Sequence, residues 1–230
     1  MADDGSLLDD YHRLGVLDES DDATLRHFCI NTEINAQYQL CSTYPSMLVV
    51  PSQAPPEMLR NVASFRSRNR LPVLVWRDPA NSAGHLVRCA QPKRGILGKK
   101  DSWDEAYVGL IEETAVRSRS SPGGPNRRMV VFDCRSFTAA HANEFRGGGV
   151  ESAQRYGARA IEYAALHNVH YVRRVVLAIR HRAPGQAAHS QWVRAQAALL
   201  RASLRVAQLL RDGATILLHC SDGWDRTPVR

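Results

Sequence analysis

The chain has 230 residues, of which 44% are hydrophobic and 23% charged, a composition typical of a soluble globular protein and not of a disordered or fibrous one. The net charge is +7, and the positive side chains are nearly all arginines, because Lys93, Lys99 and Lys100 are the only lysines. The flat guanidinium fork suits phosphate oxygens better than an ammonium does. The charge balance therefore favours anionic partners: phosphoinositide headgroups, an acidic membrane surface or nucleic acid.

The five cysteines are odd in number, widely spaced and free of any CxxC pair. This pattern gives no support to a zinc ribbon or a thioredoxin motif, and it fits free thiols in a reducing compartment. The acidic N-terminus lacks the long apolar stretch of a signal peptide, and no segment approaches the roughly 20 apolar residues of a membrane span. We expect any membrane contact to be peripheral, and no motif indicates a metal or a cofactor.

The predicted elements of the first half alternate strand and helix after a polar start. Residues 1–24 are rich in Asp, Ser and Gly and are expected to form an acidic, flexible lead-in. The run SMLVVP (46–51) predicts a buried strand, and residues 55–70 predict a helix opened by two prolines. Residues 71–76 and 85–90 predict two further strands, separated by turn residues.

The alternation continues in the middle of the chain. Residues 101–117 predict a helix capped by Ser102, with a glutamate three residues later at the capping-box spacing. Residues 129–133 predict a strand. The glycine run at 147–149 predicts a turn that opens into a helix ending near Leu166.

The last predicted elements are a long helix and a buried strand. Residues 168–172 are expected to be a short apolar stretch after a loop. Residues 190–213 predict a helix that Ser190 caps and Gly213 ends, with an apolar stripe that indicates core packing. Residues 214–219 predict a buried strand. Strands interleaved with helices indicate an α/β fold with a central sheet, and no repeat or linker divides it.

The strongest chemical signal follows this last strand, where Cys220 and Arg226 stand six positions apart. Ligands bind at the carboxyl ends of strands in α/β sheets. Gly223 permits a tight turn, and the backbone N–H groups of such a loop, followed by a helix start, form an anion-binding nest. Arg226 would clamp two phosphate oxygens. The same positive field favours the thiolate of Cys220, which is the nucleophilic form.

Other residues of the run suit displacement of a phosphate ester. Thr227 is placed to donate its hydroxyl to the thiolate or the leaving sulfur, and His219 to fix the loop through backbone hydrogen bonds. Asp225 and Asp222 are the candidate proton donors to the leaving alcohol, and one of them would later activate water to hydrolyse a phosphocysteine. The cysteine–arginine spacing alone also fits a buried cysteine followed by an ordinary Asp/Gly turn.

The nine-residue run HCSDGWDRT resembles the signature loop of the myotubularin phosphatases. These cysteine-dependent enzymes are related in fold to protein tyrosine phosphatases and remove the 3-phosphate from phosphatidylinositol 3-phosphate and phosphatidylinositol 3,5-bisphosphate. The segments YQLCSTYPSMLVVP, ASFRSRNRLPVLVWRDP, RCAQPKRGILGKK, FDCRS, RGGGVES and LHNVHYVR also occur in the family's order. The resemblance implies that residues 25–230 form a partial myotubularin-type phosphatase domain, with a central mixed sheet flanked by helices.

The resemblance also implies roles for individual residues. Cys220 is the implied nucleophile and Arg226 the phosphate clamp. Asp225 is the favoured general acid, with Asp222 contacting the substrate or sharing the acid role. The residues implied to bind the substrate present backbone N–H groups to the phosphate or line the headgroup pocket: Ser221, Gly223, Trp224, Asn143, Asn168 and Val169. Taken without the family, the two asparagines are an ordinary loop residue and an ordinary turn residue. No metal or other cofactor is implied.

Two neighbouring features each have two interpretations. The glycines at 147–149 form either a backbone loop beside the pocket or a flexible entry to the next helix. Four cations, Lys93, Arg94, Lys99 and Lys100, form either a basic patch that faces anionic lipid or a solvated charged loop. The sequence leaves both alternatives open.

The chain departs from the family at both ends, since ordinary members carry an N-terminal lipid-binding domain of the PH-GRAM type and continue well past the signature loop. We expect either a 3-phosphoinositide phosphatase or, with the fold incomplete at the C-terminus, a catalytically inactive phosphoinositide-binding or scaffolding fragment. The loop residues disfavour a protein tyrosine phosphatase.

The implied partners are a phosphoinositide substrate, an anionic membrane surface bound peripherally and a homo- or hetero-oligomer, with no nucleic acid. The implied location is cytoplasmic, at endosomal-type membranes.

Overall fold

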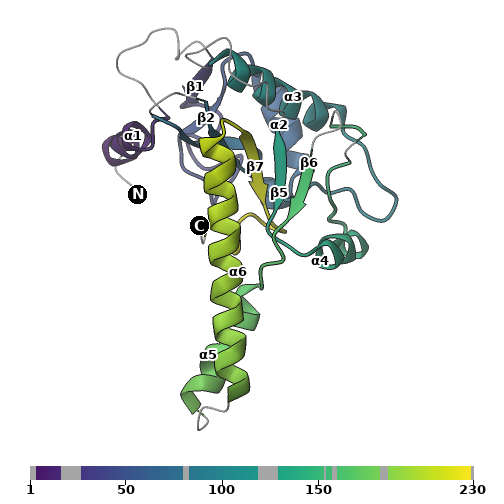
Figure 1. The fold of residues 1–230 in the computed structure, drawn as a ribbon. Helices are drawn as coiled ribbons and strands as arrows, with labels where there is room; N and C mark the ends of the chain where they lie inside the picture. The colour runs from purple at the N-terminus through teal and green to yellow at the C-terminus, as the bar shows by residue number, and fades with distance from the viewer. Residues whose placement is uncertain are drawn as a thin grey trace.

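The computed structural model describes residues 4–16, 27–79, 83–118, 129–152, 154–156, 160–181 and 186–228. Within these residues a five-stranded sheet lies at the centre of the molecule (Figure 1). Its strands lie in the order β3 (Val73–Arg77), β4 (His85–Arg88), β7 (Thr215–His219), β5 (Val130–Asp133) and β6 (Ala160–Tyr163). β3 is antiparallel to β4 and the other neighbours are parallel, so the expected mixed sheet is confirmed.

The remaining elements lie around this sheet (Figure 1). A separate antiparallel pair joins β1 (Phe28–Asn31) to β2 (Leu48–Pro51). The helices are α1 (Asp4–Arg13), α2 (Pro56–Phe65), α3 (Ser102–Arg117), α4 (Phe137–Ala142), α5 (Val169–His181) and α6 (Gln186–Arg211), with 3₁₀ turns η2 (Ser67–Asn69) and η3 (Asn143–Arg146). No helix in the described part of the chain is both long and apolar enough to cross a membrane.

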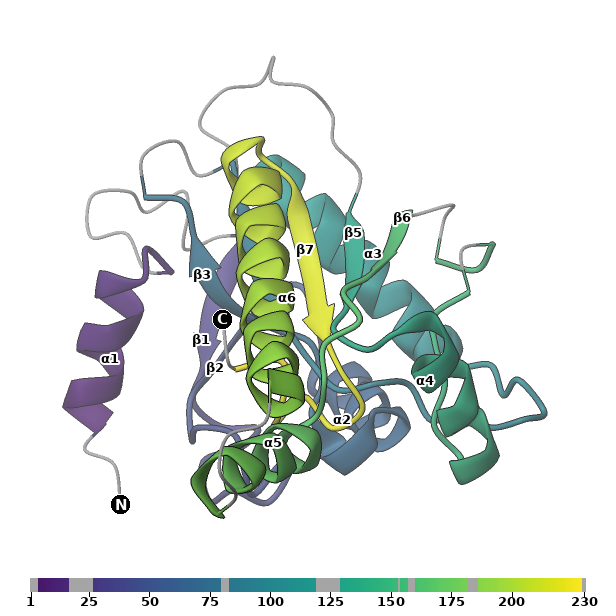
Figure 2. The ribbon, with the colours of Figure 1, turned by 60° about the horizontal axis from the view of Figure 1, so that its bottom comes forward.

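Alternate residues of the central strands face opposite layers of helices. Val131 and Leu217 are buried in one cluster with α2, α3 and β2. Ile216 and Leu218 are buried in a second cluster with residues of α6 such as Val206. Successive strand side chains point to opposite faces, so β7 is buried on both sides. Figure 2 shows α6 crossing one face of the sheet, with α2 and α3 on the other.

The segment after the glycine run does not form the predicted helix. Ala160–Tyr163 form β6, which pairs in parallel with β5, and the pairing continues as Leu166 N donates to Cys134 O at 2.9 Å. The expectation was wrong because β5 offers an open edge, and backbone pairing at that edge outweighs the helix propensity of the local alanines. Residues 168–172, expected as a short apolar stretch, are the residue before α5 and the first four residues of this helix.

Two helix starts also differ from the predicted ones. Asp101 and not Ser102 caps α3, because the Asp101 carboxylate accepts a hydrogen bond from Asp104 N at 2.9 Å. α6 begins at Gln186, so Ser190 lies inside the helix. At the other end of α6, Gly213 has a φ of +81° and ends the helix as predicted.

The N-terminal residues differ from a flexible lead-in within the described part of the chain. Asp4–Arg13 form α1, and Tyr11 and Val16 are buried in the core. The Tyr11 hydroxyl donates to Met47 O at 2.7 Å. Residues 17–26 lie outside the described residues, so the division of the chain at residue 25 stays a prediction.

Candidate active site

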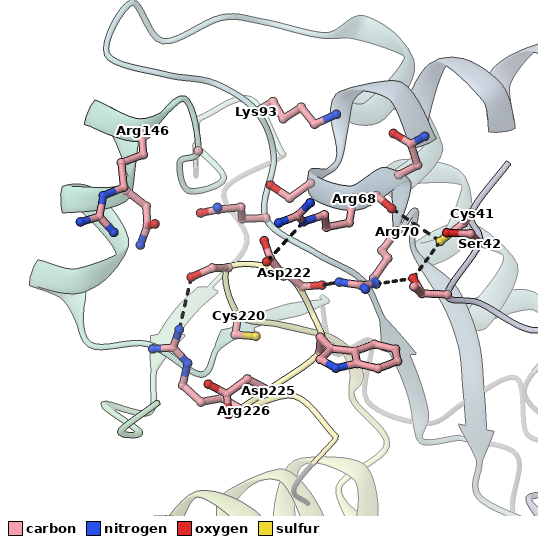
Figure 3. Close-up of a pocket in the computed structure, with 18 of the residues that line it drawn as sticks. Cys41, Ser42, Arg68, Arg70, Lys93, Arg146, Cys220, Asp222, Asp225 and Arg226 are labelled. Carbon is pink, nitrogen blue, oxygen red and sulfur yellow. Dashed lines mark hydrogen bonds and ion pairs between the residues drawn. The ribbon is translucent and has the colours of Figure 1, made fainter. Parts of the chain in front are cut away.

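The loop that follows β7 lines an open cavity of about 1450 Å³ at the carboxyl end of the sheet. Cys220 begins this loop and is only 1% exposed. Figure 3 shows its side chain between Asp222 on one side and Asp225 and Arg226 on the other. The other walls come from residues within five stretches of chain: 38–43, 67–70, 91–93, 143–148 and 168–170.

The cavity brings together nine of the ten predicted site residues. They come from the loop and from two walls: Cys220, Ser221, Asp222, Trp224, Asp225, Arg226, Asn143, Asn168 and Val169. The tenth, Gly223, lies in the loop and packs against the chain that follows β4, where a Cβ would lie 2.3 Å from Cys89 O. Its φ is +64°, so both the conformation and the close approach require glycine. The structure places these residues together, and their chemical roles stay predictions.

Two arginines that the sequence analysis did not identify hold the loop from outside. Arg88, the last residue of β4, donates to Gly223 O at 2.7 and 3.2 Å, and Arg70 donates to Asp222 O. The Arg70 guanidinium also lies 4.8 Å from the centre of the Trp224 ring. A trans peptide unit points its N–H away from its C=O. With Asp222 O turned toward Arg70, the next amide, that of Gly223, points toward the cysteine.

The surroundings of Cys220 favour its thiolate. Burial raises the pKa of the Cys220 thiol, but the hydroxyl and amide of Thr227, the charge of Arg226 and the amide of Gly223 outweigh it, so this pKa lies below its usual value. Thr227 Oγ1 is buried and makes no other hydrogen bond among the described residues. The thiolate is the nucleophilic form of cysteine, so Cys220 is suited to attack an electrophile.

Arg226 has an unsatisfied hydrogen-bond donor. Its Nη2 donates to Ser221 Oγ at 3.2 Å. Its Nε is buried and has no partner within the part of the chain that the structure describes. Leaving a buried donor unpaired is unfavourable, and an anionic oxygen held in the loop would satisfy it. This geometry fits the predicted phosphate clamp.

The two aspartates of the loop lie in different surroundings. Asp225 Oδ2 accepts a hydrogen bond from Val169 N at 2.9 Å, in the first turn of α5, which the Asn168 side chain caps. Asp222 Oδ2 lies 3.6 Å from Arg68 Nε, and the Arg68 side chain is largely exposed whereas that of Asp222 is about half exposed. Asp225 is therefore tied to the cavity wall, whereas Asp222 pairs with a solvent-exposed arginine.

The glycine run packs against the cavity and does not open a helix. Gly148 N donates to Asn143 O at 2.9 Å, and Gly149 N donates to Gln91 Oε1 at 3.4 Å. A Cβ on Gly148 would lie 2.5 Å from the Gln91 side-chain amide. Of the two interpretations of this run, the backbone loop beside the pocket is confirmed.

A chain of buried charges, missed by the sequence analysis, reaches the loop from behind. Arg66 is buried and donates to Asp104 at 2.7 and 2.6 Å and to Glu151 Oε1 at 2.6 Å. The other oxygen of Glu151 lies 3.0 Å from His219 Nε2, and His219 Nδ1 lies 3.1 Å from Cys220 O. These contacts connect the layer of α2 and α3 to the end of β7.

The Glu151–His219 contact is an ion pair when His219 is protonated. Burial raises the pKa of Glu151, but the charges of His219 and Arg66 lower it well below its usual value. Burial lowers the pKa of His219, but Glu151 and Asp133 raise it above its usual value. One signal could have found these residues, because Arg66 and Glu151 lie inside segments whose order resembles the family.

Comparison with known proteins agrees with this geometry. Residues 4–229 match the family described as "Myotubularin-like phosphatase domain". Myotubularin of Rattus norvegicus is 35% identical over 230 residues, covering 96% of this chain and 35% of that protein. Phosphatidylinositol-3,5-bisphosphate 3-phosphatase MTMR2 of Bos taurus is 34% identical, covering 96% of this chain and 33% of that protein. Myotubularin of Xenopus laevis is 35% identical over 206 residues.

The chain spans about one third of the length of these relatives. The family match nevertheless extends over nearly all of this chain, from α1 to the residues after Arg226. The resemblance carried by HCSDGWDRT is confirmed over the same range. The chain therefore belongs to the family of myotubularin-like phosphatase domains.

Proposed function

We propose that the protein is a phosphoinositide 3-phosphatase that acts through a phosphocysteine intermediate. The observation that carries this proposal is the loop after β7, where Cys220 has a lowered pKa and Arg226 has an unpaired, buried Nε. A nucleophilic thiolate and a cationic clamp are the groups that phosphoryl transfer to cysteine requires. The name of the Bos taurus relative supports a 3-phosphoinositide as the substrate class.

In the proposed first step the 3-phosphate lies in the loop, bound by backbone N–H groups and by the guanidinium of Arg226. Cys220 Sγ attacks phosphorus, so that an S–P bond forms while the P–O bond to the inositol ring breaks. Asp225 donates a proton to the leaving oxygen. We assign the acid role to Asp225 because its carboxyl lies in the cavity wall beside Val169, where the inositol ring would sit.

In the proposed second step a water molecule attacks the phosphocysteine. Asp225, now a carboxylate, takes a proton from this water. The S–P bond breaks, and inorganic phosphate and the Cys220 thiolate are released. In this scheme Asp222 contacts the substrate near Arg68 and takes no proton.

The cavity suits a headgroup with several negative charges. Arg68, Lys93 and Arg146 line it in addition to the clamp Arg226. Cations around a partly enclosed cavity raise the local concentration of anionic substrates. Because the proposed substrates are membrane lipids, we extend the proposal to peripheral action at the cytoplasmic face of endosomal-type membranes.

Phosphate release from phosphatidylinositol 3-phosphate and phosphatidylinositol 3,5-bisphosphate tests the proposal. We expect release by the wild type, a loss of at least about a thousandfold in Cys220→Ser and Arg226→Ala, and a loss of about a hundredfold in Asp225→Asn. Arg205→Ala is the matched control, because this arginine pairs with Glu162 on the surface and does not line the cavity.

Two outcomes would contradict the proposal in different ways. If neither lipid loses phosphate while the wild type still binds the headgroup, the chain is a binding or scaffolding module. If a phosphotyrosine peptide is hydrolysed faster than either lipid, the lipid substrate is wrong and the phosphocysteine chemistry remains.

A further inference from the structure

A loop beside the cavity exposes two large aliphatic side chains. Ile96 is 65% exposed and Leu97 is 97% exposed. Phe145, in the η3 turn of the adjoining wall, is 78% exposed. Single exposed apolar side chains are ordinary on a protein surface. Three of them on two adjoining segments at the edge of one cavity indicate an interaction site.

The backbone of residues 94–99 holds the two aliphatic side chains outward in a hydrogen-bonded turn. Gly98 N donates to Gly95 O at 3.1 Å, and Lys99 N donates to Arg94 O at 2.8 Å. Both glycines have a φ of +60°, which other residues adopt only with strain. Ile96 and Leu97 form the apolar tip of this loop, and their exposure is a consequence of the hydrogen-bonded turn.

This loop is fixed to the wall of the cavity. Gly95 N donates to Gly148 O at 2.8 Å, and Gly148 lines the cavity. Arg94 Nη1 donates to Val150 O at 2.8 Å, so Arg94 braces the loop. Figures 1 and 2 both show the segment that precedes α3 beside α4. A surface that binds the tip would therefore lie against the mouth of the cavity.

Cations flank the apolar tip. Lys99 and Lys100 are exposed and pair with no carboxylate among the described residues. Burial and the nearby charge of Lys99 lower the pKa of Lys93, which itself lines the cavity. Arg146 lines it too, and Figure 3 shows Lys93 and Arg146 around the opening above Cys220. The positive charge thus continues from the tip into the cavity.

We propose that this loop is a membrane-docking surface: Ile96 and Leu97 insert into the interface of an anionic bilayer while Lys99 and Lys100 contact lipid phosphates. Exposed apolar side chains rimmed by lysines bind such interfaces through apolar burial and attraction to anionic lipid together. Phe145 would insert beside them. The choice of a bilayer as partner rests on the proposed function, since a lipid headgroup reaches the cavity from a membrane.

Co-sedimentation with vesicles of phosphatidylcholine and a minor fraction of phosphatidylserine tests this surface, because these vesicles contain no substrate. Ile96→Ser combined with Leu97→Ser is expected to weaken binding about tenfold at every salt concentration. Lys99→Ala combined with Lys100→Ala is expected to weaken it about tenfold at low salt, with a difference that shrinks as salt is added.

Leu200→Ser combined with Leu204→Ser is the matched control. These leucines are 63% and 70% exposed on α6 and do not line the cavity, so two exposed aliphatic side chains are removed elsewhere by the same substitutions. The control is expected to bind vesicles as the wild type does. An equal loss in the control overturns the proposal. Unchanged binding of the Ile96 and Leu97 variant also overturns it and points to a protein partner for the tip.

A comparison of two substrates separates this inference from the proposed function. The rate on lipid in vesicles, divided by the rate on soluble inositol 1,3-bisphosphate, is expected to fall about tenfold in the Ile96 and Leu97 variant. An unchanged ratio contradicts the docking surface alone. A wild type that binds vesicles but hydrolyses neither substrate contradicts the proposed phosphatase activity alone.

Discussion

Thr227 is a small side chain with a direct effect on the candidate nucleophile. Burial raises the pKa of Cys220, and the hydroxyl and amide of Thr227 are the groups that lower this pKa most. Thr227→Val keeps the shape of the side chain and removes the hydroxyl. We expect the Cys220 pKa to rise, because the thiolate loses a hydrogen bond that the thiol does not need. The pH dependence of alkylation by iodoacetamide measures this change.

Thr227→Ser is the control for this experiment, because it retains a hydroxyl. Its alkylation profile should stay close to that of the wild type. If the valine variant also keeps the wild-type midpoint, Thr227 has no part in activating Cys220.

The residues around Cys220 differ in how well the sequence predicted them. The loop residues follow one another in a single run, so their spacing and chemistry were visible. Arg66 and Glu151 were not found, because they stand 85 positions apart and only the fold brings them together. A buried charge is indistinguishable from a solvated one in the local sequence, since its neighbours along the chain are not its partners.

The loop after β7 depends on Gly223, which both a left-handed conformation and close packing require. Gly223→Ala would place a Cβ 2.3 Å from Cys89 O in a left-handed conformation. We expect a loss of more than about 2 kcal/mol in unfolding free energy and a large loss of phosphatase activity. Chemical denaturation and phosphate release measure the two effects.

Gly147→Ala is the matched control, because Gly147 also has a left-handed conformation. Its φ is +80°, but a Cβ there would meet nothing within 4 Å. It should lose only about 1 kcal/mol, the strain of the left-handed conformation. Equal losses in the two variants would show that the contact with Cys89 O has no effect of its own.

The elements were predictable where one pattern determined them. β2, β5 and β7 are buried on both faces, so each is a continuous apolar run that can be recognised in the sequence. β6 was missed because its strand pairing is non-local and alanines flank it in the sequence, at 158, 164 and 165. The start of α5 was missed because its cap is Asn168, a residue that had been considered only as a turn or a pocket residue.

At the scale of the whole molecule, the Glu151–His219 pair makes stability depend on pH. His219 has a raised pKa in the fold, so its contribution is complete below its unfolded pKa of about 6.5 and is lost as the pH rises through the folded value. Glu151 has a lowered pKa, so its contribution is present above about 4.3 and is lost as the pH falls through the folded value. The pair therefore stabilises most between these two values.

Thermal unfolding across this range measures the effect. His219→Gln should lower the unfolding free energy by about 3 kcal/mol near pH 6, because Glu151 loses one of its two charged partners. The difference from the wild type should narrow as the pH rises above about 6.5. His189→Gln, on the exposed side of α6, should leave the wild-type profile unchanged. A constant difference at all pH values would contradict the ion pair.

The position of β7 has a consequence for how the protein is made. β7 is the last strand in the described sequence but the middle strand of the sheet, and it pairs with both β4 and β5. At about 5–20 residues per second of synthesis, β4 and β5 leave the ribosome well before β7 and present unpaired edges until it inserts between them. The strand that pairs with both of these edges leads directly into Cys220. A nascent chain therefore gains this loop only at the step that pairs the open edges of β4 and β5.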